Sequence, residues 1–354
     1  MKRLLNTLYI TYGNRYLSLD GENVVVMEDK KEIGRIPLHN LQAIVTFGYT
    51  GASPALMGAC AQRNIELSFM SGNGRFLARV SGEEKGNVTL RKTQYRISEK
   101  KEESVKIAKN FILGKVYNAR WVLERAARDY SMRLDAELLK KKSAFLGQSM
   151  NKIRECEDAG TLLGLEGEAA SVYFSAFDEL ILQQKEDFYY KSRSRRPPMD
   201  NVNALLSFAY SLLTSMCVSA LETVGLDPYA GFFHTERPGR CSLALDLVEE
   251  FRACFADRFV LSVINKKILT YKDFTQKENF GVLLEDDSRK KFISAWQAKK
   301  YEKITHPFLN EKVEWGMVPY VQAMLLARFL RGDLDGYPAV SYTHLRAHET
   351  RRHL

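Results

Sequence analysis

One change of periodicity along this chain limits its fold more than any other feature. Before about residue 85, short β-branched and aromatic runs alternate with turn residues, which is the pattern of β-strands. After the polar segment 81–86, apolar residues recur at the spacing of α-helices. We therefore expect an α+β protein, with a small N-terminal β-sandwich-like domain at 1–85 and a larger all-α domain at 86–339.

The expected elements follow from this pattern, and 354 residues are enough for about two domains of ~150 residues each. Strands are predicted at 9–12, 24–26, 33–36, 43–47, 65–69 and 76–80, with one helix at 54–63. Further helices are predicted at 106–128, 134–156, 169–184, 203–223, 244–255, 289–300 and 312–330. Residues 340–354 follow neither period although they hold three of the six histidines, and we interpret them as a non-native tail.

An uncharged stretch, residues 201–221, raises the question of a membrane span. A spanning helix needs ~20 predominantly apolar residues. Seven Asn, Ser and Thr side chains are spread along this stretch, so a buried core helix is the better interpretation.

Charge and cysteine usage narrow the class of protein. The formal net charge is +9, which favours an anionic partner such as nucleic acid or an acidic membrane surface. The five cysteines are scattered and form no Cys-x-x-Cys pair. This usage predicts reduced thiols in a cytoplasmic protein, and neither a disulfide framework nor a zinc site.

Three carboxylates and one imidazole between residues 166 and 249 carry the most chemistry. Glu166 lies between glycines, His234 follows Gly231-Phe232-Phe233, and Asp246 and Glu249 are three residues apart. On a helix that spacing puts both acids on one face. Oxygen ligands suit Mg²⁺, and Mn²⁺ also accepts an imidazole. Such a metal can stabilise charge on a phosphate and activate an attacking hydroxyl.

Each of these residues also has a plain structural interpretation. Glu166 would sit in a turn before a helix and face its dipole. His234 would be an ordinary loop histidine. Asp246, Glu249 and Glu250 would form the solvated acidic face of an amphipathic helix that Ser242 could cap.

Two segments combine cations with aromatic rings. Residues 188–198 contain Lys191, Arg193, Arg195 and Arg196, and residues 89–96 contain Arg91. Cations contact phosphates and rings stack on unpaired bases, so these residues are candidate DNA contacts. A solvated linker is the alternative for each segment.

Together and in this order, these motifs resemble the CRISPR-associated adaptation integrases, the larger of the two proteins that acquire new spacers. The likeness runs from residue 1 to 339 and is closest to the form of type I subtype C. It rests on the segments 86–91, 166–174, 196–208, 231–234 and 246–252.

The resemblance implies a site, a reaction and partners. Glu166, His234, Asp246 and Glu249 would bind Mg²⁺ or Mn²⁺, with Glu250 as an alternative to Glu249. A 3′-hydroxyl of a captured fragment would attack a phosphodiester of the CRISPR repeat. The implied partners are double-stranded DNA, a second copy paired through the β domains, and a small ferredoxin-like protein.

Two other functions stay open at this point. A metal-dependent nuclease without strand transfer would use the same residues. A non-enzymatic basic scaffold would leave the acidic helix face solvated. It predicts that Asp246→Ala leaves every activity and metal-binding signal unchanged.

Overall fold

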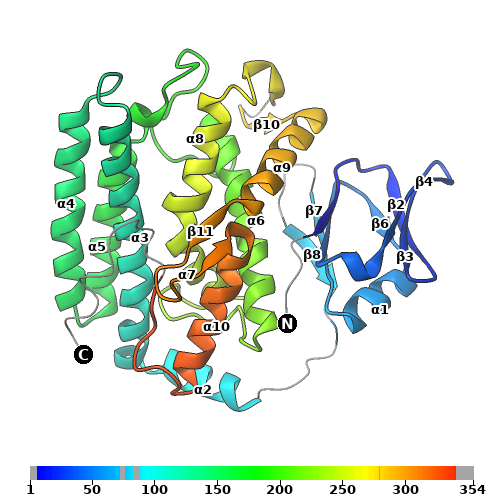
Figure 1. Cartoon of the computed structure of the whole chain (residues 1–354), viewed down its shortest axis with the longest axis horizontal. Coiled ribbons are helices and arrows are strands. Elements are labelled where there is room, and N and C mark those ends of the chain that lie inside the picture. Colours follow the sequence, from blue (N-terminus) through cyan, green and yellow to red (C-terminus); the bar gives the residue numbers. More distant parts are fainter. Residues whose placement is uncertain (1–5, 72–75, 81, 83–87, 279, 340–354) are drawn as a thin grey trace.

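The computed structural model describes residues 6–71, 76–80, 82, 88–278 and 280–339. A strand-rich N-terminal domain is followed by a mostly helical one, which confirms the predicted α+β class (Figure 1). The predicted junction at 81–86 and the tail at 340–354 lie almost entirely outside these residues.

Two four-stranded sheets make up the N-terminal domain. One has the order β1 (Thr7–Ile10), β5 (Ala43–Phe47), β7 (Glu66–Met70), β8 (Phe76–Val80). The other has the order β4 (Lys31–Pro37), β3 (Asn23–Glu28), β2 (Arg15–Asp20), β6 (Gly51–Ala52). Helix α1 (Pro54–Gln62) packs beside them, and Leu17, Ile44 and Leu56 are fully buried in their common core.

Three helices of the helical domain pack side by side, namely α3 (Lys101–Asp129), α4 (Ala136–Glu155) and α5 (Ala159–Ser175) (Figure 1). The remaining helices are α2 (Val88–Glu99), α6 (Asn201–Thr223), α7 (Ser242–Phe251), α8 (Arg258–Asn265), α9 (Asp286–Tyr301) and α10 (Val318–Leu330). A π-helical turn, η3 (Arg252–Asp257), joins α7 to α8. The described part of this domain is not all helical, because it includes the hairpins β9 (Phe274–Gln276) with β10 (Val282–Leu284) and β11 (Lys303–Thr305) with β12 (Lys312–Glu314).

Helix α5 starts ten residues earlier than the sequence pattern predicts. Asp158 caps it by accepting the N–H of Thr161 at 2.9 Å, and the helix then runs through Gly164 and Gly167. The glycines were taken for a turn, but capping and packing of α5 against α3 and α4 outweigh a cost of about 1 kcal/mol per helical glycine. The predicted turn at Glu166 is therefore wrong, and this residue lies within the helix.

The uncharged segment forms α6, which is the one described helix long and apolar enough to cross a membrane by length and composition alone. Asp200 caps it through the N–H of Asn203 at 2.7 Å. Leu205, Leu206 and Leu213 are fully buried among neighbouring elements. Its packing is that of a core helix.

Side-chain contacts join the two domains along α6 and α9. Ser215 of α6 donates to Glu66 of β7 at 2.8 Å, and Arg79 of β8 pairs with Glu222. Arg289 of α9 donates to the carbonyl of Thr11 at 3.2 Å. These contacts set one sheet of the β domain opposite α6.

Candidate functional site

Asp246 positions the loop that carries His234. It lies in the first half of α7 with no exposed surface. Its Oδ2 accepts the backbone N–H groups of Phe232 at 2.7 Å and Phe233 at 3.0 Å, and its Oδ1 accepts that of His234 at 2.8 Å. Burying an unpaired carboxylate costs several kcal/mol, and hydrogen bonds to its charged form offset that cost. Asp246 therefore shapes the loop that carries the histidine.

Gly231 allows this loop to lie directly against α7. A Cβ at this position would lie 2.7 Å from Cβ of Ser242 and 3.0 Å from Oδ2 of Asp246. Those distances are shorter than any ordinary contact, so only glycine fits. The predicted cap by Ser242 is wrong: Cys241 is the N-cap residue, and the Ser242 hydroxyl donates to the carbonyl of Thr235 at 3.2 Å.

His234 is oriented by the same carboxylate. Its Nδ1 lies 2.7 Å from Oδ1 of Asp246. Because an ionised carboxylate only accepts hydrogen bonds, Nδ1 carries the proton, and in a neutral imidazole Nε2 then holds the lone pair. Nε2 points to the side of Glu249, whose Oε1 lies 3.9 Å away.

Glu249, one turn after Asp246, is surrounded by cations. Its Oε1 accepts Nη1 of Arg252 at 2.8 Å, and its Oε2 lies 2.7 Å from Nζ of Lys115. Burial alone would raise the pKa of Glu249, but Arg252 and Lys115 outweigh it and lower the pKa to about 2. The carboxylate is therefore ionised at neutral pH.

Glu166 joins the site through Lys115 of α3. The Lys115 ammonium forms an ion pair with Oε1 of Glu166 and another with Glu249, so it lies between carboxylates from α5 and α7. The predicted Glu166, His234, Asp246 and Glu249 thus come together from three separate parts of the chain. The structure adds Lys115 between Glu166 and Glu249.

Glu250 faces away from this cluster. It accepts hydrogen bonds from the Tyr337 hydroxyl and, at 2.9 Å, from Gln322 of α10. Glu249 is therefore the acid that faces His234. All three acids of α7 are buried, so the interpretation of a solvated acidic face is wrong.

The π-helical turn η3 completes the surroundings. Arg252, at its start, stacks 4.5 Å from the ring centroid of Tyr210, and the Tyr210 hydroxyl donates to Asp257 at 2.5 Å. Burial raises the pKa of Asp257 to about 6. Tyr173 of α5 lies nearby, and its buried hydroxyl interacts with Asp257.

Glu166, Glu249 and Nε2 of His234 can bind a divalent cation once Lys115 moves away from the two glutamates. Among residues 6–71, 76–80, 82, 88–278 and 280–339, no three His, Cys, Asp or Glu side chains stand together as a metal site as arranged. Lys115 lies between the two glutamates. Oε2 of Glu249 is buried and lies 2.7 Å from the Lys115 ammonium. An anionic oxygen that faces a cation in this way is a suitable ligand for Mg²⁺ or Mn²⁺.

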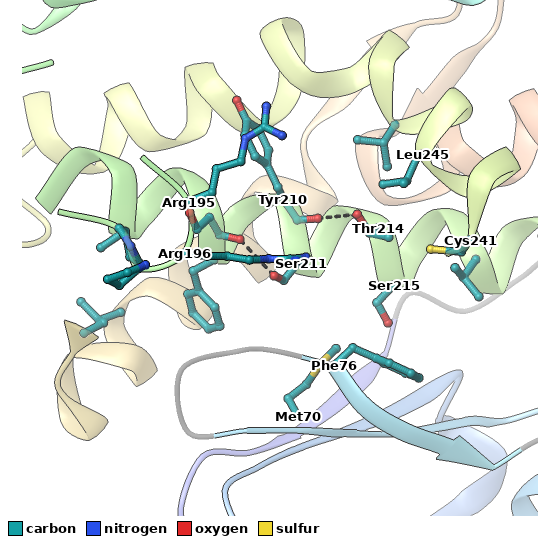
Figure 2. A pocket seen from close by; sticks show the side chains of 18 of the residues that line it. Met70, Phe76, Arg195, Arg196, Tyr210, Ser211, Thr214, Ser215, Cys241 and Leu245 are labelled. Carbon is teal, nitrogen blue, oxygen red and sulfur yellow. Dashed lines mark hydrogen bonds between the residues drawn. The ribbon is translucent and has the colours of Figure 1, made fainter. Parts of the chain in front are cut away.

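A cleft of about 1250 Å³ leads to the cluster and runs between α6 and the β domain. Figure 2 shows Met70 and Phe76 of the β domain facing Ser215 of α6 across it. His234 and Glu249 are among its lining residues. Its described lining holds three glutamates and eight basic side chains, namely Arg79, Arg193, Arg195, Arg196, Arg240, Arg252, Lys277 and Arg289. The excess of positive charge favours a polyanion.

The predicted DNA contacts divide into three groups. Arg195 and Arg196 are exposed and line the cleft. Arg193 lines it too, but its guanidinium is half-buried and donates to Asn203 at 2.6 Å and Ser207 at 3.0 Å, so it holds the loop in place. Lys191 and Arg91 lie outside the lining, with Lys191 over the ring of Tyr189.

Sequence reasoning missed Lys115, Arg252, Tyr210 and Asp257. One signal was present for Lys115, because it interrupts an otherwise apolar stripe on α3 formed with Ile112, Val116 and Ala119. A lysine on a buried helix face is seldom left without a carboxylate partner.

Solved structures share this fold. A casposase bound to integration product superposes with a TM-score of 0.81 at 24% identity, covering 96% of this chain and 95% of the casposase. The Cas1 protein of Thermotoga maritima superposes with a TM-score of 0.78 at 23% identity, covering 92% and 97%. The class is therefore that of Cas1-like folds.

Sequence comparison gives the family itself. The family described as CRISPR associated protein Cas1 matches residues 8–298. The CRISPR-associated endonuclease Cas1 2 of Rhodospirillum rubrum is 51% identical over 342 residues, covering 96% of this chain and 98% of that protein. The CRISPR-associated endonuclease Cas1 1 of Chlorobaculum tepidum is 48% identical over 338 residues, again covering 96% and 98%. The chain belongs to the Cas1 family.

Proposed function

We propose that this chain is a metal-dependent DNA integrase and endonuclease of CRISPR adaptation. It inserts captured DNA fragments into the repeat array by attack of a 3′-hydroxyl on a phosphodiester. The observation that carries the proposal is that Glu166 and Glu249 converge on Lys115 while Nε2 of His234 lies beside Glu249, in the lining of a strongly basic cleft. The relatives named as Cas1 endonucleases and the casposase with its integration product support it.

The three residues have distinct roles in this proposal. Glu166, Glu249 and Nε2 of His234 hold Mg²⁺ or Mn²⁺, which when bound stabilises negative charge on the phosphate and activates the attacking hydroxyl. Asp246, predicted as a fourth ligand, already accepts four N–H groups through its two oxygens. We therefore assign it to positioning: it holds the loop and keeps the Nε2 lone pair of His234 available.

The cleft supplies the binding energy for DNA. Arg195, Arg196 and Lys277 lie along its wall and can contact phosphates, which positions the duplex without reading its sequence. Arg252 neutralises Glu249 and is held by the Tyr210 ring, so it keeps part of the site's negative charge balanced. A scissile phosphate can then approach His234 and Glu249 with less repulsion.

The proposed partners follow the family resemblance. A second copy of the chain would pair through the β domains, and a small ferredoxin-like partner would join them in the cytoplasm. A solved complex named Cas6-RT-Cas1–Cas2 contains a chain with this fold, with a TM-score of 0.80 at 21% identity. The likeness to type I subtype C also stays a prediction.

A strand-transfer assay tests the proposal. Purified protein with its small partner and Mn²⁺ or Mg²⁺ would receive a labelled fragment with free 3′-hydroxyls and a supercoiled plasmid carrying the repeat. We expect joined product that requires metal, persists in His39→Ala, and is lost in His234→Ala and Glu249→Gln. His39 is an exposed histidine of the β domain and serves as the control.

The two alternatives give different results in the same assay. Cleavage without joining would identify a nuclease without strand transfer. DNA binding with neither reaction, unchanged in His234→Ala, would identify a non-enzymatic scaffold and overturn the proposal.

A further inference from the structure

Lys115 takes up the position between two carboxylates that a divalent cation would need. Its side chain is only 11% exposed, and its ammonium pairs with Glu166 of α5 and with Glu249 of α7. The two glutamates come from helices that each pack against α3. Without this ammonium, two negative charges would face each other in a buried place, which is strongly unfavourable.

A divalent cation between the same oxygens cannot share the position with an ammonium. Both are compact positive charges, and their repulsion is large where water is excluded. Lys115 must therefore move when a metal binds. A lysine is suited to such a move, because rotation about the bonds of its four-carbon side chain can relocate the ammonium while the backbone stays in α3.

The structure offers a place for the displaced ammonium. A cavity of about 20 Å³ adjoins Lys115 and is lined by Tyr173 of α5 and Asp257 of η3. That volume is enough for one water-sized group. The Tyr173 hydroxyl is buried and interacts with Asp257, which is the one carboxylate in the described lining. Arg252 also lines the cavity but is already paired with Glu249 and Tyr210.

We propose that Lys115 is a displaceable counter-ion: it neutralises Glu166 and Glu249 before metal binds, and it withdraws to Tyr173 and Asp257 when metal enters. This inference rests on the proposed function, because it assumes that the glutamates are metal ligands. Lys115 would then control the metal affinity of the site. It stabilises the fold in the absence of metal, and it weakens metal binding because the ammonium must first be displaced.

Metal affinity of the full chain tests this directly. Free Mn²⁺ would be counted by electron paramagnetic resonance during titration of the wild type, Lys115→Met and Lys115→Gln. We expect both variants to bind Mn²⁺ tighter by about tenfold, the usual size of coupling between two linked sites. Without metal both should melt at a lower temperature than the wild type, and Mn²⁺ should raise their Tm by more. Lys106→Met, at an exposed lysine of the same helix, is the control and should match the wild type.

Tyr173→Phe tests the second position of the ammonium. It removes only the hydroxyl, so Mn²⁺ affinity should fall several-fold in the wild-type background and stay unchanged in the Lys115→Met background. Equal or weaker Mn²⁺ binding in both Lys115 variants would overturn the counter-ion role while leaving the metal site in place. If no form of the protein bound Mn²⁺, the proposed metal site would fall as well.

Discussion

Asp246 accepts the Nδ1 proton of His234 at 2.7 Å while three consecutive backbone N–H groups of the same loop donate to its two oxygens. One carboxylate thus fixes both the path of the loop and the orientation of the imidazole. The free Nε2 is left facing Glu249. This relationship separates the acid that positions the histidine from the acid that can reach a metal.

Asp246→Asn tests that separation. The amide NH₂ of asparagine is a hydrogen-bond donor and would face the backbone N–H groups, which are donors as well. The amide also no longer requires the proton of His234 to be on Nδ1. We expect strand transfer to fall by about 10- to 100-fold, as for other residues that orient a ligand. The free energy of unfolding should fall by about 1–3 kcal/mol in urea titrations. Mn²⁺ affinity should fall less than in Glu249→Gln, and the reverse order would show that Asp246 is itself a ligand.

Gly231→Ala tests how closely the loop must approach α7. The added methyl group would meet Ser242 at 2.7 Å, so the loop must shift and lengthen the hydrogen bonds to Asp246. We expect a loss of about 1–3 kcal/mol in stability, the usual cost of overpacking, together with reduced strand transfer. Gly164→Ala is the matched control, since a Cβ there meets nothing within 4 Å on α5. It should stabilise the chain by about 0.5–1 kcal/mol.

Arg195→Ala and Arg196→Ala test the cleft as a phosphate-binding surface. Each should weaken DNA binding by a similar factor for all sequences. Each should also reduce the slope of log affinity against log salt by about 1, measured by fluorescence anisotropy at several salt concentrations. Arg128→Ala, at an exposed arginine near the end of α3, should leave the slope unchanged. Unchanged slopes for the first two variants would place the DNA elsewhere.

Asp273 gives the protein a specific dependence on acid pH. Burial would raise its pKa, but hydrogen bonds from Lys291, Ser288 and Thr270 outweigh it and lower the pKa to about 2. Because the pKa in the folded state is below the unfolded value, its contribution is present above pH ~4 and is lost as the pH falls toward 2. Asp273→Asn should lower the free energy of unfolding at pH 7 by about 1–2 kcal/mol, measured by urea titration. Its free energy of unfolding should also fall less steeply between about pH 4 and pH 2 than that of the wild type. An equally steep fall in the variant would show that other carboxylates cause it.

Local patterns predicted most of the elements but not their ends. The apolar runs located β5 and β8 well, although only β5 is fully buried and the side chains of β8 are mostly exposed. Strand β2 was missed because its buried residue, Leu17, stands among polar neighbours. The start of α5 was missed because glycines near Glu166 suggest a turn. Capping by Asp158 and packing against α3 instead stabilise a helix through these glycines.

The site was predictable only in its donor types. Glu166, His234, Asp246 and Glu249 could be selected from the sequence, but their different roles depend on contacts between distant segments. Lys115 lies 51 residues before Glu166, and the ion pair that joins them exists only once α3 and α5 have packed. No local pattern distinguishes Glu249, which faces the site, from Glu250, which faces α10.

The π-helical turn η3 makes the chain sensitive to insertions and deletions between α7 and α8. A π turn holds one more residue than an α turn, so it acts as a single-residue insertion between α7 and α8. Deleting one residue from 252–257 would rotate α8 by about 100° relative to α7. Phe259 and Ile264 would then leave the core, and α8 would lose its register with the acids of α7. We therefore expect insertions and deletions among relatives to accumulate in the surface loops and to be absent from this segment.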